Sequence, residues 1–456
     1  MELKISKYIE VVKDIQINSE EVIILMFSMN TGSLFSVKKE YYKKLVKNRF
    51  TEIPIELLNK LIRDKFIISQ ETDEISQCLD LNDLMIKDLR KLNFTIQPTA
   101  DCQLGCSYCG QTHANITMDI SLFDKIINRI SNIINNKPKN FYDTISISWY
   151  GGEPILAINK IIDFSKILID FASKNNLIYE SDIITNGVLL NKNNLENLII
   201  NAKISSFQIT LDGLKDTHDN RRFKKDKAGG SFDDIIENIL NIKVNKIFIE
   251  NNCKILLRIN VDKNNYDEIP QLIRFLKELE IQKYLYLNFA PVVDWGGNGA
   301  SINSLTRKQL AEMEINWILD SIKFGFNIPN LLPYRSPSCM IVNPASEVYD
   351  ADGYITPCYE MNYTKMYENS NHIIGNLNNI DKIKEVSPLR EWHSLLRLGK
   401  YPCTRCKYLP VCGGSCPKDW FKKEPACPTY KYNLKDRMVL DFLNIKDKLK
   451  ELVDNE

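Results

Sequence analysis

The stretch TADCQLGCSYCG (99–110) holds three cysteines in the spacing C-x3-C-x2-C, directly after the predicted strand FTIQPTA (94–100). Three thiolates on one short loop suit three irons of a cubane cluster, which leaves the fourth iron without a protein ligand. A structural zinc site would use four protein ligands, and His113 is the nearby candidate for the fourth. The spacing therefore favours an iron–sulfur cluster with one open iron, with zinc as the alternative. The three cysteines are Cys102, Cys106 and Cys109.

Around this loop, short apolar runs alternate with amphipathic helical patterns from about residue 93 to about residue 325. The second run, TISISWYGGEP (144–154), precedes INKIIDFSKILIDFASKN. Six strand–helix units of this kind predict an α/β fold with a parallel sheet and right-handed crossovers. Six units form a partial (β/α)6 TIM barrel in place of the closed eight-unit form. The four later strands are SDIITNG (181–187), SFQITLDG (206–213), ILLRINVD (255–262) and YLYLNFAPV.

Short polar motifs lie on or at the ends of four of these strands. Taken singly, each motif is an ordinary turn or carries a surface residue. Their shared position indicates a site, because functional residues of α/β sheets gather at the carboxyl ends of strands. The motifs are Gly151-Gly152-Glu153-Pro154, Thr185-Asn186-Gly187, Thr210-Leu211-Asp212-Gly213 and Arg258-Ile259-Asn260.

Together, the cysteine loop and these motifs resemble the radical S-adenosylmethionine (radical SAM) superfamily, in the expected order from residue 93 to about 290. Tyr108 occupies the aromatic position that this family has before its third cysteine. The resemblance implies a [4Fe–4S] cluster on the loop, with SAM chelated to its open iron. Electron transfer to SAM would release a 5′-deoxyadenosyl radical, which abstracts hydrogen from an unactivated C–H bond.

The resemblance also implies roles for individual residues in SAM binding. The backbone and the glutamate of the GGEP motif would receive the methionine ammonium. The motifs on the next three strands would contact the ribose and the carboxylate. The residues expected to bind SAM are Tyr108, Gly151, Gly152, Glu153, Pro154, Thr185, Asn186, Thr210, Asp212, Arg258 and Asn260.

The last part of the chain is irregular and rich in Cys, Pro, Gly and Tyr, so metal sites are its expected organisers. It holds seven cysteines, and Gly353 between the first two suits a tight turn. CxxC pairs often bind zinc. The full spacing resembles the SPASM extension of radical SAM peptide-modifying enzymes, which implies two auxiliary [4Fe–4S] clusters. By that resemblance the distal cluster has the ligands Cys403, Cys406, Cys412 and Cys427, and the proximal cluster has Cys339, Cys358 and Cys416.

The proximal set therefore lacks a fourth cysteine. Sulfatase-maturing relatives have an extra cysteine shortly after the position of Cys339, where this chain reads Met-Ile-Val-Asn-Pro-Ala-Ser. They also have an Asp base where Tyr359 follows Cys358 here. Both departures argue against a formylglycine-generating enzyme. The open ligand position would suit a substrate cysteine thiolate, as in thioether-forming maturases, and a non-Cys ligand or a water is the alternative.

Residues 1–90 are expected to form a winged-helix-like domain. EVIILMFSM (21–29) and LFSV predict a hairpin about the turn Asn30-Thr31-Gly32, followed by two helices and a short strand. Such a unit resembles the RiPP recognition element, which binds a leader peptide by strand addition. EVIILMFSM and the helix near 54–65 would supply the strand edge and the groove. DNA binding is disfavoured because 14 Lys/Arg balance 15 Asp/Glu, and a plain cap on the barrel is a further alternative.

Composition sets the broad class of the 456-residue chain, whose predicted domains are 1–90, 91–325 and 326–456. The 59 basic and 58 acidic side chains give no general preference for a polyanion. No apolar run reaches the ~20 residues of a membrane span, and the first residues lack a signal-peptide core, which predicts a cytoplasmic protein. Of the twelve cysteines, Cys78, in the expected acidic linker ETDEISQCLDLND, and Cys253, in a loop before a strand, have no ligand spacing and are expected to be dispensable.

The combined hypothesis is an enzyme that abstracts hydrogen from a ribosomally made peptide and installs a thioether or a carbon-based crosslink. Its expected partners are a precursor peptide with a leader and an electron donor such as flavodoxin or ferredoxin, without nucleic acid or membrane. The alternatives are a maturase of a protein or a cofactor, and a non-enzymatic iron–sulfur DNA-binding regulator, which would not use the SAM motifs. No catalytic base is assigned. Four proton acceptors lie near the sites in sequence: Asp294, Glu347, Tyr359 and Glu360.

Overall fold

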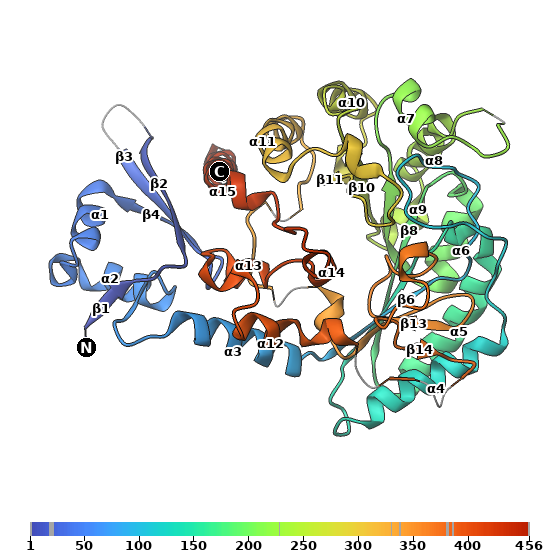
Figure 1. The fold of residues 1–456 in the computed structure, drawn as a ribbon. Helices are drawn as coiled ribbons and strands as arrows, with labels where there is room; N and C mark the ends of the chain where they lie inside the picture. The colour runs from blue at the N-terminus through green and yellow to red at the C-terminus, as the bar shows by residue number, and fades with distance from the viewer. Residues whose placement is uncertain are drawn as a thin grey trace.

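A nine-stranded sheet forms the centre of the protein, seen in a computed structural model (Figure 1). The structure describes residues 2–17, 22–227, 229–329, 331–336, 339–379, 383–384 and 387–454, with backbone only for 445–454. The strand order is β11-β10-β9-β8-β7-β6-β12-β13-β14. Strands β6 to β11 are successive neighbours and pair in parallel, which confirms the predicted parallel sheet. They are β6 Lys91–Ile96, β7 Thr144–Trp149, β8 Ile178–Thr185, β9 Ile204–Thr210, β10 Lys254–Val261 and β11 Leu285–Pro291.

The alternation of side chains along each strand separates a packed outer face from a more polar inner one. In β7, Ile145, Ile147 and Trp149 are buried in the main hydrophobic core, and the Trp149 ring contacts Phe164 of the helix α5 (Ile158–Lys174). Ser148 points to the other face, where its hydroxyl donates to Asp182 of β8 at 2.7 Å. This period-two pattern follows from strand geometry and leaves polar groups inside the barrel.

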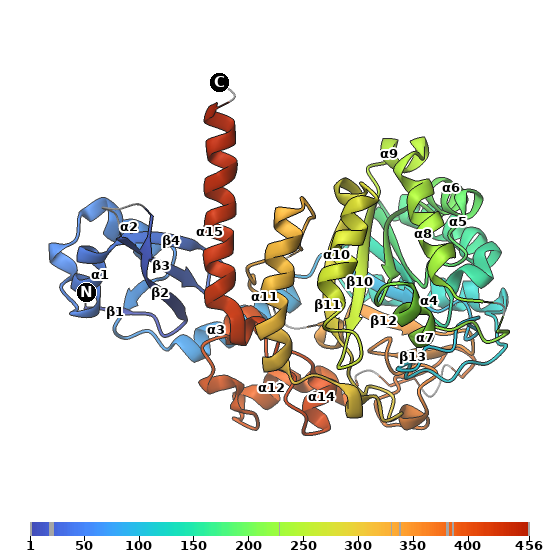
Figure 2. The same ribbon diagram turned by 90° about the horizontal axis from the view of Figure 1, so that it is seen from above.

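Helices cover the outer face of the parallel sheet (Figures 1 and 2). They return the chain from the carboxyl end of one strand to the start of the next, so that the polar motifs stay at one end of the sheet. None of the described helices combines the length and the apolar character needed to cross a membrane. The remaining barrel helices are α4 Ser121–Asn135, α6 Lys192–Ala202, α7 Lys215–Arg221, α8 Phe232–Lys243, α9 Lys246–Glu250, α10 Ile269–Glu278 and α11 Arg307–Lys323.

The cysteine-rich part of the chain extends the barrel sheet, a feature the sequence analysis did not predict. Strand β12 (Ser346–Tyr349) pairs in parallel with β6, and β13 (Tyr354–Thr356) and β14 (Gly375–Asn376) follow antiparallel. These strands are too short to show a period in sequence, which explains why the segment seemed irregular. The helices of this part are α12 Trp392–Arg397, α13 Leu409–Cys412, α14 Pro417–Phe421 and α15 Tyr430–Asp454.

The amino-terminal unit combines a three-stranded antiparallel sheet, in the order β2-β3-β4, with a two-stranded one of β1 and β5. Strand β3 pairs with both β2 and β4, so the expectation that EVIILMFSM offers a free edge is wrong. The outer strands are β2 and β4. A further helix, α3, replaces the acidic linker that the sequence suggested. The elements are β1 Leu3–Ile5, β2 Ile9–Gln16, β3 Val22–Ser28, β4 Leu34–Lys38, α1 Lys39–Val46, α2 Ile55–Arg63, β5 Ile67–Ser69 and α3 Glu74–Lys87.

One face of this sheet shares a hydrophobic core with the cysteine-rich part. Leu25 and Phe27 of β3 belong to one cluster with Trp392 of α12, Leu409 of α13 and Met438 of α15. Helix α15 lies between the amino-terminal unit and α11, and it contacts both β2 and α11 (Figure 2). The amino-terminal unit is therefore joined to the cysteine-rich segment instead of capping the barrel alone.

Polar contacts reinforce this junction on two sides. Glu10 of β2, 5% exposed, accepts a hydrogen bond from the Tyr408 hydroxyl at 2.9 Å and pairs with Lys407 at 2.6 Å. Arg335 donates to the backbone and side-chain oxygens of Asn30, at 3.2 and 3.0 Å, and to Asn82 of α3 at 3.0 Å. Since Arg335 lies four residues before Cys339, the hairpin turn is tied directly to the segment that carries this cysteine.

We expect Arg335→Met to loosen the amino-terminal unit. The variant removes the four hydrogen bonds that the guanidinium donates to Asn30, Asn82 and the Cys78 sulfur, a loss of about 2 kcal/mol or roughly 30-fold in the local opening equilibrium. Limited proteolysis under native conditions would show faster cleavage near the β3–β4 turn and in α3. The matched control is Arg63→Met, since Arg63 is an exposed arginine paired with its neighbour Asp64. Equal cleavage rates for both variants would contradict the prediction.

Candidate functional site

A cavity of about 200 Å³ opens at the carboxyl ends of the parallel strands. The cysteine loop after β6 forms one wall, and the segments that end β7, β8, β9 and β10 form the other. This placement brings together residues that are up to 258 positions apart in sequence, from Cys102 to Glu360. The predicted site residues that line it are Cys102, Cys106, Tyr108, Cys109, Gly151, Gly152, Thr185, Asn186, Thr210, Arg258 and Asn260.

Of the three cysteines of the loop, Cys102 is buried, and Cys106 and Cys109 are half-buried. Burial raises the pKa of Cys102 to about 12 and that of Cys106 to about 11, and it also raises the pKa of Cys109. The guanidinium of Arg222 opposes this rise at all three thiols. The thiols are therefore neutral near pH 7 unless a metal binds them, and metal binding would release their protons.

The glycines of the GGEP motif allow the turn after β7 to touch the cysteine loop. The Gly152 and Glu153 amides donate to the carbonyls of Thr99 and Asp101, at 3.2 and 2.7 Å. A Cβ on Gly152 would lie 2.1 Å from the Asp101 oxygen, and one on Gly151, which has φ +142°, would lie 2.6 Å from the Thr99 oxygen. Only glycine fits such an approach of two backbones.

Glu153 connects the turn after β7 to the turn after β8 by hydrogen bonds. Its carboxylate is fully buried and accepts hydrogen bonds from the Thr185 hydroxyl at 2.6 Å, the Asn186 amide at 2.7 Å and the Ile155 amide at 3.1 Å. Burial raises the pKa of Glu153, whereas the three bonds lower it. Glu153, Pro154 and Asp212 do not line the cavity, so their part in SAM binding stays a prediction.

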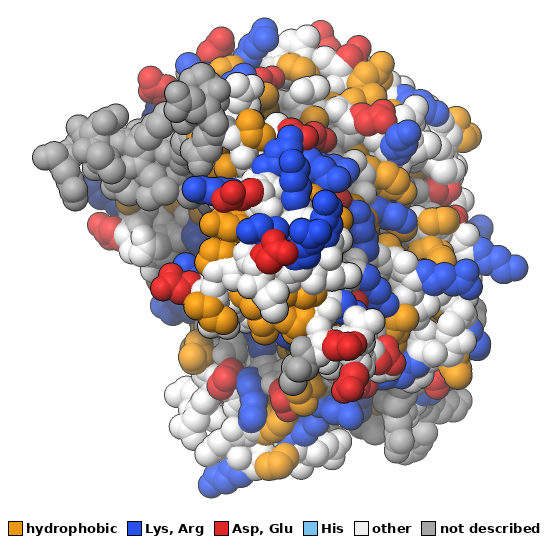
Figure 3. All heavy atoms as spheres, turned by 90° about the vertical axis from the view of Figure 1, so that its left-hand side faces the viewer, with side chains coloured by type: hydrophobic (Ala, Val, Ile, Leu, Met, Phe, Trp, Pro, Cys, Tyr) orange, Lys and Arg blue, Asp and Glu red, His pale blue; other side chains and the backbone are white. Residues whose placement is uncertain are grey.

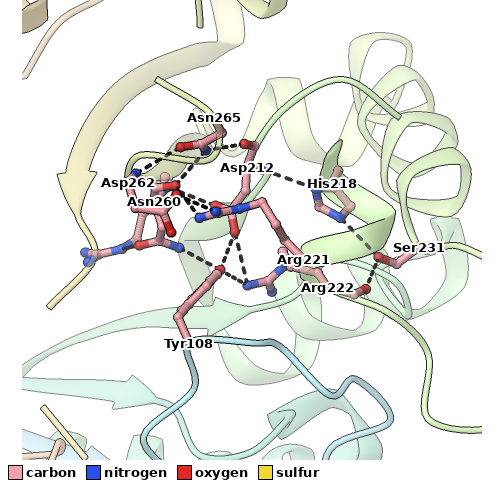
Figure 4. Close-up of polar contacts among 10 residues, drawn as sticks. Tyr108, Asp212, His218, Arg221, Arg222, Ser231, Asn260, Asp262 and Asn265 are labelled. Atoms are coloured by element: carbon pink, nitrogen blue, oxygen red, sulfur yellow. Dashed lines mark hydrogen bonds and ion pairs between the residues drawn. The ribbon is translucent and has the colours of Figure 1, made fainter. Parts of the chain in front are cut away.

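Tyr108 connects the cysteine loop to β10 through a buried polar network (Figure 4). Its hydroxyl donates to Asp212 and accepts hydrogen bonds from Arg222 Nη1 at 2.6 Å and Asn260 Nδ2 at 3.0 Å. The second carboxylate oxygen of Asp212 accepts a hydrogen bond from the backbone N–H of Asn260 at 2.8 Å. Asp212 therefore fixes Tyr108 and Asn260, which both line the cavity, without lining it itself.

A buried histidine fixes the backbone of Arg222. His218 Nδ1 accepts from the Asp212 amide at 3.2 Å, and its Nε2 lies 3.0 Å from the Ser231 hydroxyl, which donates to the Arg222 carbonyl at 2.8 Å (Figure 4). Burial lowers the pKa of His218 to about 3, so the ring is neutral and Nε2 carries its proton. This series of hydrogen bonds holds the Arg222 guanidinium in the cavity wall.

Several residues that line the cavity were not predicted. Arg222 follows a short polar helix, and no sequence signal marks its burial. Tyr150 stands between the strand TISISW and the GGEP motif, and Trp295 follows β11. The Trp295 ring lies where a Cβ on Gly110 would be 2.8 Å away, so it packs directly on the cysteine loop. The unpredicted lining residues are Gln111, Tyr150, Ile184, Gln208, Arg222 and Trp295.

The seven carboxy-terminal cysteines gather around two neighbouring cavities. One, of about 280 Å³, is lined by Cys403, Cys406, Cys412 and Cys427. The other, of about 420 Å³, is lined by Cys339, Cys358 and Cys416, and Cys412 also reaches it. Burial raises the pKa of Cys403, Cys412 and Cys416 to about 12. Because Cys412 lines both cavities, the ligand sets of four and three that the resemblance implies stay a prediction.

Tyr359 and Glu360 separate the loop cavity from the cavity of Cys339, Cys358 and Cys416, since both residues line both cavities. The Tyr359 ring packs edge-on against Tyr150 with 5.2 Å between centroids. Burial raises the pKa of Tyr359, which makes its phenolate a minor species and the residue a poor proton acceptor. Glu360 pairs with the buried Lys418 at 3.1 Å.

The other two candidate proton acceptors do not line these cavities. Glu347 is buried on β12, where Arg129 donates to both of its oxygens at 2.7 and 3.1 Å. Asp294 accepts from the amides of Gly297, Asn298 and Gly299 and so caps an exposed loop. Of the four acceptors, Glu360 and Tyr359 alone face the loop cavity.

The donor set fits an iron–sulfur cluster with SAM beside it. The loop cavity combines three thiols, two guanidinium groups and the amide group of Gln111, whose Nε2 atom is buried without a hydrogen-bond partner. Thiolates are the ligands of such clusters, and the polar groups suit an amino acid and a ribose. Within the described residues, no three His, Cys, Asp or Glu side chains are arranged to hold a single metal ion.

Residues 96–276 match the model of the Radical SAM superfamily. The matched segment holds the cysteine loop and all four strand-end motifs. Enzymes of this superfamily use SAM and a [4Fe–4S] cluster. No curated protein sequence matches the chain.

Solved structures resemble much of the chain in fold. A tagged form of anSMEcpe with bound AdoMet has a TM-score of 0.57 at 18% identity and covers 80% of this chain and 98% of its own. Native anSMEcpe with bound AdoMet and Cp18Cys peptide has a TM-score of 0.54 at 19% identity, with 80% and 100% covered. Streptococcus suis SuiB bound to the precursor peptide SuiA has a TM-score of 0.48 at 17% identity, with 94% and 98% covered.

Proposed function

We propose that the protein is a radical SAM/SPASM peptide maturase, which abstracts hydrogen from a ribosomally made precursor and installs a thioether or a carbon-based crosslink. The observation that carries the proposal is the grouping of ten cysteines around three cavities, which are lined by three, four and four of them, with Cys412 shared by the last two and the first set beside the strand-end motifs. Each set would hold one [4Fe–4S] cluster.

In the loop cavity, Cys102, Cys106 and Cys109 would hold the cluster to which SAM binds. When bound, SAM and the cluster supply a 5′-deoxyadenosyl radical. The backbone at Gly151 and Gly152 would receive the methionine ammonium. Arg222 would neutralise the methionine carboxylate: its buried guanidinium contacts Tyr108 and Asp212, and its Nε atom has no hydrogen-bond partner among the described residues. Glu153 and Asp212 would hold this arrangement from behind the cavity wall.

In the cysteine-rich part, the set of four cysteines would hold a closed auxiliary cluster. The set of three would leave one ligand position open, and we propose that a cysteine thiolate of the peptide fills it. Tyr359 and Glu360 line the boundary between this position and the SAM cavity. The Tyr359–Tyr150 ring pair would exclude water between the two and orient the peptide residue that loses hydrogen.

A peptide substrate fits the amino-terminal unit as well. Strand β2 contacts α15, so we propose that the leader adds to the other outer strand, β4, beside α1. This side of the molecule gathers Lys and Arg next to hydrophobic side chains (Figure 3). A leader with acidic and apolar residues suits such a face. The exposed side chains of α1 and α2 include Lys39, Lys43, Val46, Ile55 and Lys60.

The test is anaerobic reconstitution with iron and sulfide, followed by SAM and dithionite. Formation of 5′-deoxyadenosine supports the radical SAM site, and its absence would exclude the proposed reaction. Small peptides encoded beside the gene then serve as substrates. A crosslinked product loses two hydrogen atoms in mass, and a thioether also removes one thiol from alkylation.

Two other results would redirect the proposal. Conversion of a peptide cysteine to an aldehyde would indicate formylglycine formation, although Tyr359 stands where sulfatase maturases have an Asp base. Cleavage of SAM without modification of any neighbouring peptide would favour a protein or a cofactor as substrate.

A further inference from the structure

Three side chains form a hydrogen-bonded chain at the edge of the loop cavity. Lys225 Nζ lies 2.9 Å from His113 Nδ1, and His113 Nε2 lies 3.8 Å from Cys109 Sγ. None of these contacts is needed for the chemistry assigned above. They nevertheless place an imidazole against a predicted cluster ligand.

The donor and acceptor roles follow from the chemistry of the groups. A lysine ammonium has three N–H donors and no acceptor, so Nδ1 must accept the hydrogen bond from Lys225. A neutral imidazole carries one proton, which must then be on Nε2. Nε2 lies beside the Cys109 sulfur, so the N–H of Nε2 donates to that sulfur.

The backbone holds Lys225 in place for this role. The segment 223–225 pairs with the cysteine loop, because the Gly105 amide donates to the Phe223 carbonyl and the Lys225 amide donates to the Gln103 carbonyl, both at 2.9 Å. Lys225 Nζ also donates to the Cys102 carbonyl at 2.8 Å. One ammonium group therefore spans the start of the cysteine loop and the histidine beyond its end.

We infer that His113, oriented by Lys225, donates a hydrogen bond to the Cys109 sulfur and thereby raises the reduction potential of the cluster proposed for this loop. The inference rests on the proposed function. A cluster gains negative charge when it accepts one electron from its donor, and part of that charge resides on the thiolate sulfurs. A hydrogen bond to such a sulfur stabilises the reduced state more than the oxidised state. His113 is thus a positioning residue for electron transfer.

The experiment is a redox titration of the reconstituted full-length protein, followed by electron paramagnetic resonance. The paramagnetic resonance signal that changes on addition of SAM belongs to the loop cluster. This change distinguishes it from the signals of the auxiliary clusters. His113→Phe keeps a flat ring without a donor, and we expect about tenfold less reduced cluster at a fixed potential, about 59 mV for one electron. His113→Gln keeps an N–H donor and restores most of the difference.

Two lysine variants test the orientation of the imidazole. Lys225→Met removes the donor to Nδ1, so that the proton is no longer confined to Nε2 and the potential falls in the same direction by a smaller amount. Lys224→Met is the matched control, because Lys224 pairs with Asp234 at 2.6 Å instead of contacting His113. It leaves the potential unchanged.

The possible failures are distinguishable. A wild-type protein without any SAM-responsive signal overturns the proposed function, and this inference with it. A wild-type protein with that signal, and His113→Phe at the same potential, overturns the inference alone. If His113→Phe assembles no cluster, Lys225→Met decides, and an unchanged potential in it overturns the inference. Reduced iron content at an unchanged potential shows a merely structural histidine.

Discussion

Alanine at Cys106 is expected to abolish the reductive cleavage of SAM. The proposed cluster needs three thiolates from the loop, and Cys106 lines the loop cavity with the other two. The auxiliary sites use other cysteines in other cavities, so they keep their iron. We expect 5′-deoxyadenosine formation at background level, with the iron content reduced by one cluster of three. The assay pairs product analysis with iron quantification on the same preparation.

Cys253→Ala is the control for this variant. Cys253 is also a buried thiol, and it donates to the Ile204 and Asn251 carbonyls, at 3.7 and 4.0 Å. It does not line any of the three cysteine cavities. We expect normal SAM cleavage and normal iron content. SAM cleavage by the Cys106→Ala protein would refute the assignment of the loop. Equal losses in both variants would indicate general damage from thiol removal.

The barrel could be predicted from sequence because its signals are local and repeated. Each β-strand is a short apolar run, and each following helix has a 3.6-residue apolar period, so six copies support one another. The alternation in TISISW places Ile145 and Ile147 in the core and Ser148 inside the barrel without any tertiary information. The added strands β12 to β14 escaped prediction because two to four residues carry no period.

Helix α3 shows how charge obscured a helical signal. The stretch after Asp73 is acidic and was interpreted as a linker, yet Asp73 caps the helix by accepting from the amides of Ile75 and Ser76. Cys78, Leu79 and Asn82 are buried at helical spacing, and the first two belong to the core shared with the cysteine-rich part. Part of the surface that covers this narrow stripe, in α12, lies more than 300 residues away in sequence. Local sequence therefore gives no indication that the stripe is covered.

The sequence predicts which strand ends form the candidate site, but it does not predict which side chains contact one another there. Spacing and order located the loop, GGEP, and the motifs at Thr185, Thr210 and Arg258. The inward or outward direction of a carboxylate depends on donors from other strands. Glu153 has two such donors, from Thr185 and Asn186, and Asp212 is held by Tyr108 and Asn260, so both carboxylates lie behind the wall.

The shared core between the amino-terminal unit and the cysteine-rich part has a functional consequence under the proposed maturase activity. Glu10 contacts Tyr408 and Lys407 beside Cys406, and Arg335 joins the β3–β4 turn to the segment before Cys339. The unit proposed to hold the leader is thus fixed to both auxiliary cysteine sets. If the leader binds at β4, the core peptide that follows it would begin at a defined position relative to the open ligand site.

Methionine at Arg222 is expected to weaken SAM binding by roughly 30- to 150-fold, or about 2–3 kcal/mol. The Arg222 side chain is 8% exposed and lines the loop cavity, where we propose that it neutralises the methionine carboxylate. Methionine keeps an unbranched apolar stem and removes both the charge and the hydrogen bond to Tyr108. Arg222→Lys keeps the charge without the fork geometry, and we expect an intermediate loss. Equilibrium dialysis of labelled SAM with the reconstituted protein measures both.

Two further measurements separate binding from folding in the Arg222 variants. Loss of the guanidinium removes a donor from Tyr108 and an ion-pair partner from Asp212 at 3.9 Å, so the melting temperature falls as well. Because Tyr108 keeps its bond to Asn260, the loop stays in place and the cluster assembles. Arg274→Met on the outer face of α10 removes an exposed arginine and leaves SAM binding unchanged. Wild-type affinity in Arg222→Met would show that the carboxylate binds elsewhere, with Arg258 as the remaining guanidinium in the described cavity wall.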